Sequence, residues 1–235
     1  MILFKYGFIL FVLLMPFSGF GSVNDKHYYQ GDYPADHWAL QPYSVNDPKV
    51  IALASFHNAQ YAVFLNPTDE RGYRSIVMLV DNNDMHQVMN RDYISEERLG
   101  LGMLVQLMAE AYGHITPVSQ TALMGNNCQQ FDPDTGITYL GTAEEPCLLH
   151  AHVMGRGNPK YDYVEGVTLN GPIPGIAFLF KSKDPDVPGN DKSVAWKEGE
   201  MKKVAQRLRQ EINKIKEPYA TQGLIMSTVP DAGIQ

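Results

Sequence analysis

Two histidines, His150 and His152, alternate within the apolar run that extends from Cys147 to Arg156. If this run forms a β-strand, its period of two residues places both imidazoles on one face, with Ala151 and Val153 on the other. A neutral imidazole attacks phosphorus well near pH 7, because its ordinary pKa is about 6.5. The pair therefore indicates a site that holds and attacks a phosphate. The alternative is that both side chains fill the strand with satisfied hydrogen bonds.

Arg156 ends the same run, between Gly155 and Gly157. A guanidinium beside two imidazoles can pair with a phosphate oxygen, although an arginine at a strand end equally suits a surface ion pair. Attack by one imidazole would give a phosphohistidine and divide one difficult displacement into two easier ones.

A metal site is a further reading of the histidine pair. His57, His86 or His114 would then supply a third ligand from elsewhere in the chain. No pair of Cys or His residues at ligand spacing supports this reading, so we expect neither a metal nor another cofactor.

The elements that must position the pair follow from hydrophobic periodicity. The segment 61–65 favours a strand, a turn signal follows it, and the continuously apolar segment 75–80 favours a second, buried strand. Together they predict an antiparallel hairpin. The segment 120–127 predicts a third strand, and 137–140 one more short strand.

Two amphipathic helices are expected. Ser95 and two acidic residues begin the first, over 95–112, and Gly113 ends it. Its apolar stripe, of which Leu104 and Leu107 should face the sheet, comprises Leu99, Met103, Leu104, Leu107, Met108 and Ala111. Ser193 opens the second helix, which ends before Pro218 and carries a basic face that we expect to be solvated.

The composition limits the class of protein. The chain has 235 residues, 44% of them hydrophobic, which suits one domain with a sizeable core. Its net charge of −7 excludes a broad electrostatic footprint for nucleic acid. A small anionic substrate would have to be held by local donors.

The N-terminus has the pattern of a secretory signal peptide over residues 1–21. Lys5 precedes an apolar run over 7–17, and small residues follow. We therefore expect an exported protein, periplasmic or secreted, that meets a membrane only transiently; an uncleaved anchor is the alternative.

The two cysteines, Cys128 and Cys147, suggest a disulfide in an exported chain. It would close an insertion of about 20 residues and stabilise the fold by roughly 3 kcal/mol. Two separate buried thiols are the alternative.

The remaining segments complete the predicted organisation. Residues 22–50 should form an extended N-terminal arm that wraps a domain over 51–217, and 218–235 a C-terminal tail. The Gly- and Pro-rich segment 157–192 is interpreted as a loop that covers substrate or as an embellishment of the sheet edge.

The order of these elements, with alternating histidines on the last strand, resembles the histidine-triad (HIT) superfamily of nucleotide hydrolases and transferases. The resemblance runs from about Tyr61 to Arg156 and rests on the hairpin with Arg71-Gly72-Tyr73, the 95–112 helix and the His150-to-Arg156 motif. Tyr73 stands where the family has a histidine. The insertion between the cysteines and the missing Gly-Gln before the motif also depart from the family pattern. The fold class implied is α+β, a HIT-like antiparallel sheet with two main helices and a disulfide-closed insertion.

The resemblance implies roles for the site residues in either of two registers. In the favoured one, His150 is the nucleophile, His152 is third and Leu148 occupies the first position. In the other, His150 is first, His152 is the nucleophile and Met154 is third.

A backbone carbonyl or another histidine is implied to hold the second ring nitrogen of the nucleophile. Asn127, with Asn126 in reserve, lies where the family has an asparagine that can donate to a phosphate oxygen.

The function implied is an exported hydrolase or transferase that cleaves a phosphoanhydride or phosphoramidate bond of a nucleotide-type substrate through a phosphohistidine. A non-catalytic HIT-like ligand-binding module is the alternative. A second copy of the chain is a further candidate partner.

Overall fold

The structure is a computed structural model, and the residues that it describes are 26–44, 46–66, 73–124, 129–132, 134–157, 161–168 and 196–228. The predicted signal peptide, together with Asn126, Asn127 and Cys128, lies outside the described residues.

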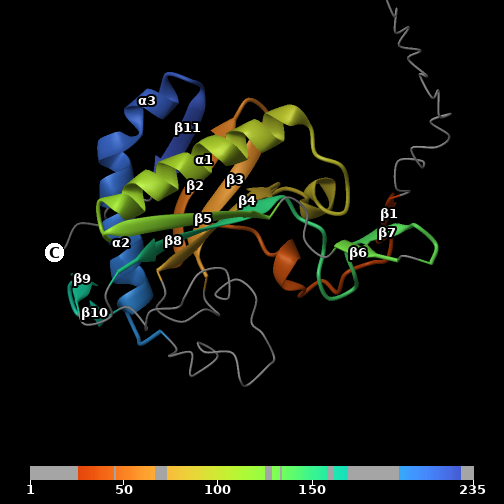
Figure 1. Ribbon diagram of the computed structural model, residues 1–235, viewed down its shortest axis with the longest axis horizontal. Helices are drawn as coiled ribbons and strands as arrows, with labels where there is room; N and C mark the ends of the chain where they lie inside the picture. Colours follow the sequence, from red (N-terminus) through yellow and green to blue (C-terminus); the bar gives the residue numbers. More distant parts are fainter. Residues whose placement is uncertain are drawn as a thin grey trace, which may run out of the picture.

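A six-stranded sheet forms the centre of the molecule, in the order β11-β2-β3-β4-β8-β5 (Figure 1). Every neighbouring pair of strands in it is antiparallel. Its strands are β2 (Val50–Phe56), β3 (Ala59–Leu65), β4 (Arg74–Val80), β5 (Val118–Met124), β8 (His150–Arg156) and β11 (Leu224–Thr228). The predicted hairpin is confirmed as β3 and β4. The strand predicted over 120–127 and the histidine strand join the same sheet as β5 and β8, whereas the short strand predicted over 137–140 belongs to a separate small sheet.

The α1 helix (Ser95–Gly113) covers one face of this sheet (Figure 1). Leu104 and Leu107 face the sheet as predicted and are completely buried. The prediction that Leu99 belongs to the buried stripe is wrong, because Leu99 is 57% exposed. Gly100 faces the sheet instead: a Cβ at this position would collide with the hydroxyl of Tyr61, so the helix approaches β3 closely where it has no side chain.

The α2 helix (Glu200–Ile215) packs beside α1 and against β2 (Figure 1). Val204, Leu208 and Ile212 on one side of this helix are buried. The guanidinium of Arg209 donates to the backbone carbonyls of Val50 and Ile51, which ties the helix to the start of β2. The helix begins later than the predicted Ser193, which lies outside the described residues.

The described part of the predicted C-terminal tail, 218–228, instead contributes to the fold. It includes most of α3 (Glu217–Ala220) and the whole of β11, which forms one edge of the sheet beside β2. Leu224 is 1% exposed, so the last strand closes part of the core.

The part of the N-terminal arm that the structure describes is joined to the rest of the molecule through a small second sheet. Its β1 (Lys26–Tyr28) pairs in parallel with β7 (Thr138–Leu140), and β7 pairs with β6 (Gln129–Phe131). Two short 3-10 helices, η1 (Trp38–Leu40) and η2 (Met85–Val88), lie against each other. The segment predicted as a loop begins with the two-stranded sheet of β9 (Asp162–Val164) and β10 (Val167–Thr168), and 169–195 lie outside the described residues.

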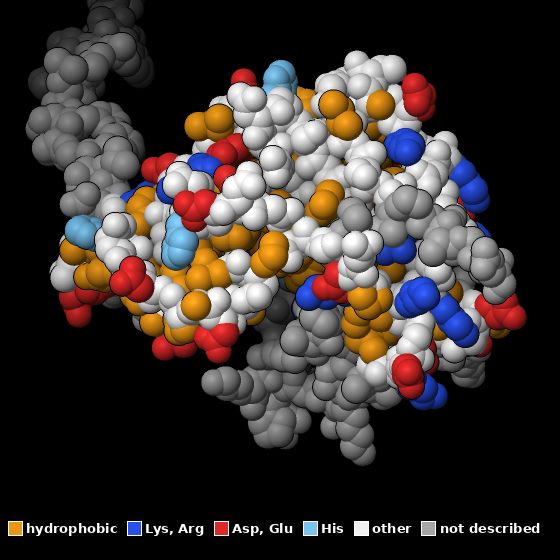
Figure 2. Space-filling view, turned by 180° about the vertical axis from the view of Figure 1, so that it is seen from behind, with side chains coloured by type: hydrophobic (Ala, Val, Ile, Leu, Met, Phe, Trp, Pro, Cys, Tyr) orange, Lys and Arg blue, Asp and Glu red, His pale blue; other side chains and the backbone are white. Residues whose placement is uncertain are grey.

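Charge is distributed unevenly over the face of the molecule shown in Figure 2. Figure 2 shows lysines and arginines gathered on the side of the molecule where α2 lies, and apolar and acidic side chains around the small sheet of β1, β6 and β7. The basic face of α2 carries exposed Lys202 and Lys203, which agrees with the prediction of a solvated face. No helix among the described residues is long and apolar enough to cross a membrane.

The structure does not support the predicted disulfide-closed insertion. Cys147 is a free thiol and is fully buried. Its backbone is tied to Asn90 and Tyr93, and burial raises the pKa of its thiol to about 11. This half of the predicted bridge behaves as a core residue, as the alternative of buried thiols describes.

Candidate functional site

His150 and His152 lie on β8, between β4 and β5 in the sheet. Their ring centroids are 5.1 Å apart at an interplanar angle of 85°, so the imidazoles share one face as the strand period predicts. Ala151 and Val153 point to the opposite face and are completely buried. Gly155, on that same side, has no room for a Cβ because of Tyr112 of α1, which shows how tightly the helix packs there. The histidines therefore occupy the face away from α1.

The ring of His150 is held by its own strand. Its Nδ1 lies 3.0 Å from the carbonyl oxygen of Leu148, and a carbonyl can only accept. Nδ1 therefore carries the proton and Nε2 carries the lone pair. Burial lowers the pKa of His150, although the bond to Leu148 opposes that shift. The ring is neutral at pH 7, with its free nitrogen defined by the backbone.

His152 is held differently. Its Nδ1 is buried and has no hydrogen-bond partner in the part of the chain that the structure describes. Burial, then the positive charge of Arg74 and then His150 lower the pKa of His152 to about 3. Both rings are therefore neutral near pH 7 and are enclosed, with 4% of His150 and 8% of His152 exposed.

Arg74 is a basic residue of this face that the sequence patterns did not single out. It begins β4 opposite Met154, in the same alternation as Ile76 and Met78, which lie opposite His152 and His150. Arg74 is 9% exposed; burial lowers its pKa to about 10, so it remains a cation at neutral pH. The sequence feature that could have identified Arg74 is a charged residue directly before the predicted buried strand 75–80.

The other predicted site residues are not all brought to the pair. The backbone of Arg156 lies at the end of β8 opposite Val118, and its side chain is outside the described part of the structure. Asn126 and Asn127 lie outside the described residues altogether. Tyr73, where the resemblance places a histidine of the family, is buried and donates through its hydroxyl to the carbonyl of Val167 at 2.5 Å.

The histidines considered as further metal ligands have other surroundings. His57 packs edge-on against Phe56 in the β2–β3 turn, and His114 lies 3.3 Å from a carboxylate oxygen of Glu211. Within the described ranges, no group of three or more His, Cys, Asp or Glu residues is arranged to hold a metal ion.

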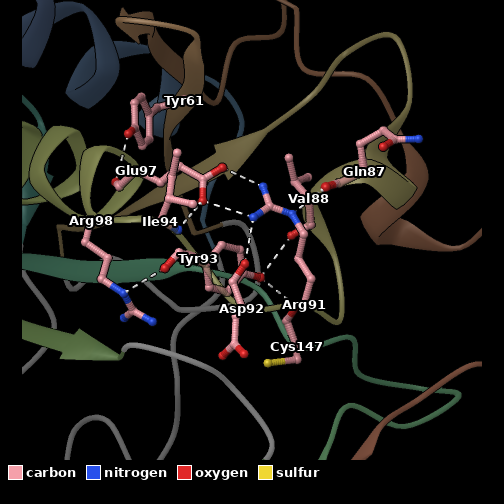
Figure 3. Close-up of polar contacts among 10 residues, drawn as sticks. All are labelled: Tyr61, Gln87, Val88, Arg91, Asp92, Tyr93, Ile94, Glu97, Arg98 and Cys147. Atoms are coloured by element: carbon pink, nitrogen blue, oxygen red, sulfur yellow. Dashed lines mark hydrogen bonds and ion pairs between the residues drawn. The ribbon is translucent and has the colours of Figure 1, made fainter.

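The segment leading into β8 is anchored by polar contacts from the connector before α1 (Figure 3). The hydroxyl of Tyr93 lies 2.9 Å from the carbonyl oxygens of both Val88 and Cys147. Arg91 and Glu97 form a two-pronged ion pair that fixes this connector to the first turn of α1. The start of the histidine strand is therefore attached to the connector, which is itself bound to α1.

Comparison with known proteins places this geometry in a family. The family model described as HIT-like, HIT-related, matches residues 47–208. The crystal structure of the uncharacterized protein LPG0439 is similar with a TM-score of 0.73 and 32% sequence identity, covering 87% of this chain and 98% of that one. The structure of a HIT-like protein involved in cell-cycle regulation from Bartonella henselae gives a TM-score of 0.33 and 14% identity, over 73% of this chain and 85% of that one. No curated protein matches the chain.

Proposed function

This chain belongs to the HIT-like family, and we propose that it is an exported hydrolase or transferase that cleaves a phosphoanhydride or phosphoramidate bond of a nucleotide-type substrate. The observation that carries the proposal is the bond from His150 Nδ1 to the carbonyl of Leu148. This bond leaves Nε2 as the ring nitrogen with a lone pair, which a nucleophile requires.

The proposed reaction has two displacements. His150 Nε2 attacks the phosphorus, and the new N–P bond forms as the bond to the leaving group breaks; that group takes up a proton. Water, or another acceptor in a transferase, then attacks the phosphohistidine, loses its proton and regenerates the neutral ring. The cationic ring of the intermediate is stabilised by the Leu148 carbonyl, because the negative end of that dipole faces Nδ1.

The neighbours of His150 have supporting roles in this proposal. His152 donates a hydrogen bond to a phosphate oxygen or to the leaving group. Arg74 supplies positive charge on the same face, where low solvent exposure strengthens its attraction for a phosphate. Arg156, Asn126 and Asn127 stay predicted contacts with the substrate, on the residue types and positions that the sequence offers.

The proposed export of the protein and its proposed substrate class are supported by the sequence. The N-terminal pattern of a basic residue, an apolar run and small residues supports export. The nucleotide part of the substrate is inferred from the family resemblance. Because the net charge is −7, an anionic substrate would have to be held by local donors and not by the overall field of the protein.

The second candidate is a HIT-like binding module without turnover. It is favoured by the enclosure of both imidazoles and by Leu148, which puts an apolar side chain at the first position of the triad.

Trapping of the intermediate tests the two candidates against each other. The protein is mixed with nucleoside 5′-phosphoramidates and dinucleoside polyphosphates labelled at the α-phosphorus, then quenched at short times. The proposal expects an acid-labile, base-stable label on the wild-type protein and none on His150→Ala. His114→Ala, a change of a histidine outside the pair, should keep the label. Saturable binding of the same compounds without label or turnover would establish the binding module instead.

A further inference from the structure

Asn90 makes unusual contacts with the segment before the histidine strand. Its backbone N–H donates to the carbonyl of Cys147 at 2.9 Å, and its side-chain Oδ1 accepts from the N–H of Cys147 at 2.8 Å. One residue thus satisfies both backbone polar groups of Cys147. Asn90 has φ of +50°, a left-handed conformation that asparagine adopts more readily than most residues. The isolated bridge between Met89 and Leu148 continues the same contact.

The carboxamide of Asn90 is itself held at its other end. Its Nδ2 donates to the hydroxyl of Tyr33 in the N-terminal arm at 2.8 Å, and that hydroxyl donates to the carbonyl of Thr142 at 3.0 Å. Gly141, with φ of +82°, makes room for the carboxamide, because a Cβ there would collide with Oδ1. The arm, the connector and the segment before β8 therefore meet at one side chain.

These contacts fix the peptide that orients the nucleophile. Asn90 anchors Cys147, and the carbonyl of Leu149 accepts from the N–H of Leu79 at 2.9 Å. With the residues on both sides anchored, the carbonyl of Leu148 is held in the direction of the His150 ring.

We propose that Asn90 is a positioning residue for His150: by fixing Cys147 it aims the Leu148 carbonyl at Nδ1 and so selects the tautomer with a free Nε2. This inference rests on the proposed function for its catalytic meaning. The effect on the tautomer exists in the free protein, whether or not the protein turns over a substrate.

Two substitutions separate the contact from the backbone conformation. Asn90→Gly removes the carboxamide and accepts a positive φ without strain. Asn90→Asp keeps an oxygen that accepts from Cys147 and also tolerates this conformation. Protein labelled with ¹⁵N-histidine reports the tautomer of each ring by NMR, and the His150 signals are assigned from His150→Asn.

The wild type should show His150 in the Nδ1-protonated form, and Asn90→Gly should show a mixture with the Nε2-protonated form. Asn90→Asp should restore the wild-type tautomer. If the protein is active, kcat of Asn90→Gly should fall about 10–100-fold with little change in KM, because the substrate contacts remain and the ring is misaligned.

Two controls separate positioning from general loss of stability. Asn83→Gly changes an exposed asparagine, and Val204→Ala lowers stability from the core side of α2. Both should keep the wild-type tautomer. If Asn90→Gly does not fold, Tyr33→Phe loosens the carboxamide and should give a smaller fraction of the second tautomer.

An unchanged tautomer in the folded Asn90→Gly variant, or in Tyr33→Phe where the glycine variant does not fold, would overturn the inference. A shifted tautomer in a protein that never forms a phosphohistidine would leave the positioning role intact and contradict the proposed function.

Discussion

The ring Nδ1 of His150 lies 3.0 Å from the carbonyl oxygen of Leu148, two residues earlier in the same chain. In the favoured register Leu148 would stand at the first triad position; its side chain is apolar, and it is its backbone carbonyl that holds the His150 ring. The Nδ1 of His152 has no such partner among the described residues. Within the proposed function, this relationship therefore favours His150 over His152 as the nucleophile.

Substitution of the second histidine tests that register. His152→Ala should lower turnover about 10²–10³-fold, the typical cost of one lost donor to developing charge, and leave a phosphohistidine that can be trapped. Rapid-quench labelling measures both quantities. If His152→Ala removes the label and His150→Ala keeps it, the nucleophile is His152 and Met154 fills the third position.

Stability should fall on mild acidification because both rings are buried in the neutral form. The pKa of each is lower than the value near 6.5 expected in the unfolded chain, and that of His152 lies at about 3. Below about pH 6.5 the unfolded chain binds protons that the folded chain does not, and each histidine lowers the free energy of unfolding by up to about 1.4 kcal/mol per pH unit. Urea unfolding between pH 7.5 and pH 5 measures this slope.

Two variants test whether the pH dependence of stability arises from the histidine pair. His152→Asn cannot take up the proton and should make the dependence on pH shallower. Met78→Ala, on the same face, should lower stability by a similar amount at each pH, since it removes packing and no titrating group. An unchanged slope in His152→Asn would show that acid sensitivity arises elsewhere.

Arg74 should influence both substrate binding and the protonation of His152. Arg74→Met keeps much of the buried volume and removes the charge. The pKa of His152 should rise, because the Arg74 charge helps to lower it, and affinity for an anionic phosphate should weaken about tenfold or more. NMR titration and equilibrium binding of inorganic phosphate measure the two effects. Arg98→Met, at an exposed position on α1, should change neither.

Periodicity was sufficient to predict much of the architecture. Alternation predicted the shared face of His150 and His152, and helical spacing predicted that Leu104 and Leu107 are buried. The sequence analysis assigned no strand to 51–56, and β11 lies in a segment predicted as a tail, whose strand character depends on pairing with β2. Those two strands are defined by tertiary contacts.

The supporting residues of the site were less predictable for the same reason. Asn90 and Cys147 are separated by 57 positions, and no local pattern relates them. From the sequence alone, Arg74 resembles a surface residue at a strand end. Only the fold shows that it is buried. The disulfide was inferred from an even cysteine count in a chain expected to be exported, and that count does not reveal that Cys147 packs inside the core.

The thiol of Cys147 should react slowly in the folded protein. It is completely buried, and its pKa is raised to about 11, so little thiolate is present at neutral pH. In a Cys128→Ser variant, alkylation by iodoacetamide should be slow natively and fast in guanidinium, as followed by intact mass. Rapid native labelling, or a Cys128–Cys147 peptide found by non-reducing mapping of the unmodified chain, would contradict this assignment.

Neighbouring residues of β11 provide the final test of the fold. Leu224 is 1% exposed and lies opposite Phe56 of β2, whereas Ile225 is 68% exposed. Leu224→Ala should lower the free energy of unfolding by roughly 2–4 kcal/mol, because it removes buried methyl groups and leaves a cavity. Ile225→Ala, on the solvent side of the same strand, should change it by less than about 0.5 kcal/mol. Urea unfolding of both variants measures the difference. Equal, small effects would mean that this segment is the loose tail suggested by its sequence and adds no strand to the core.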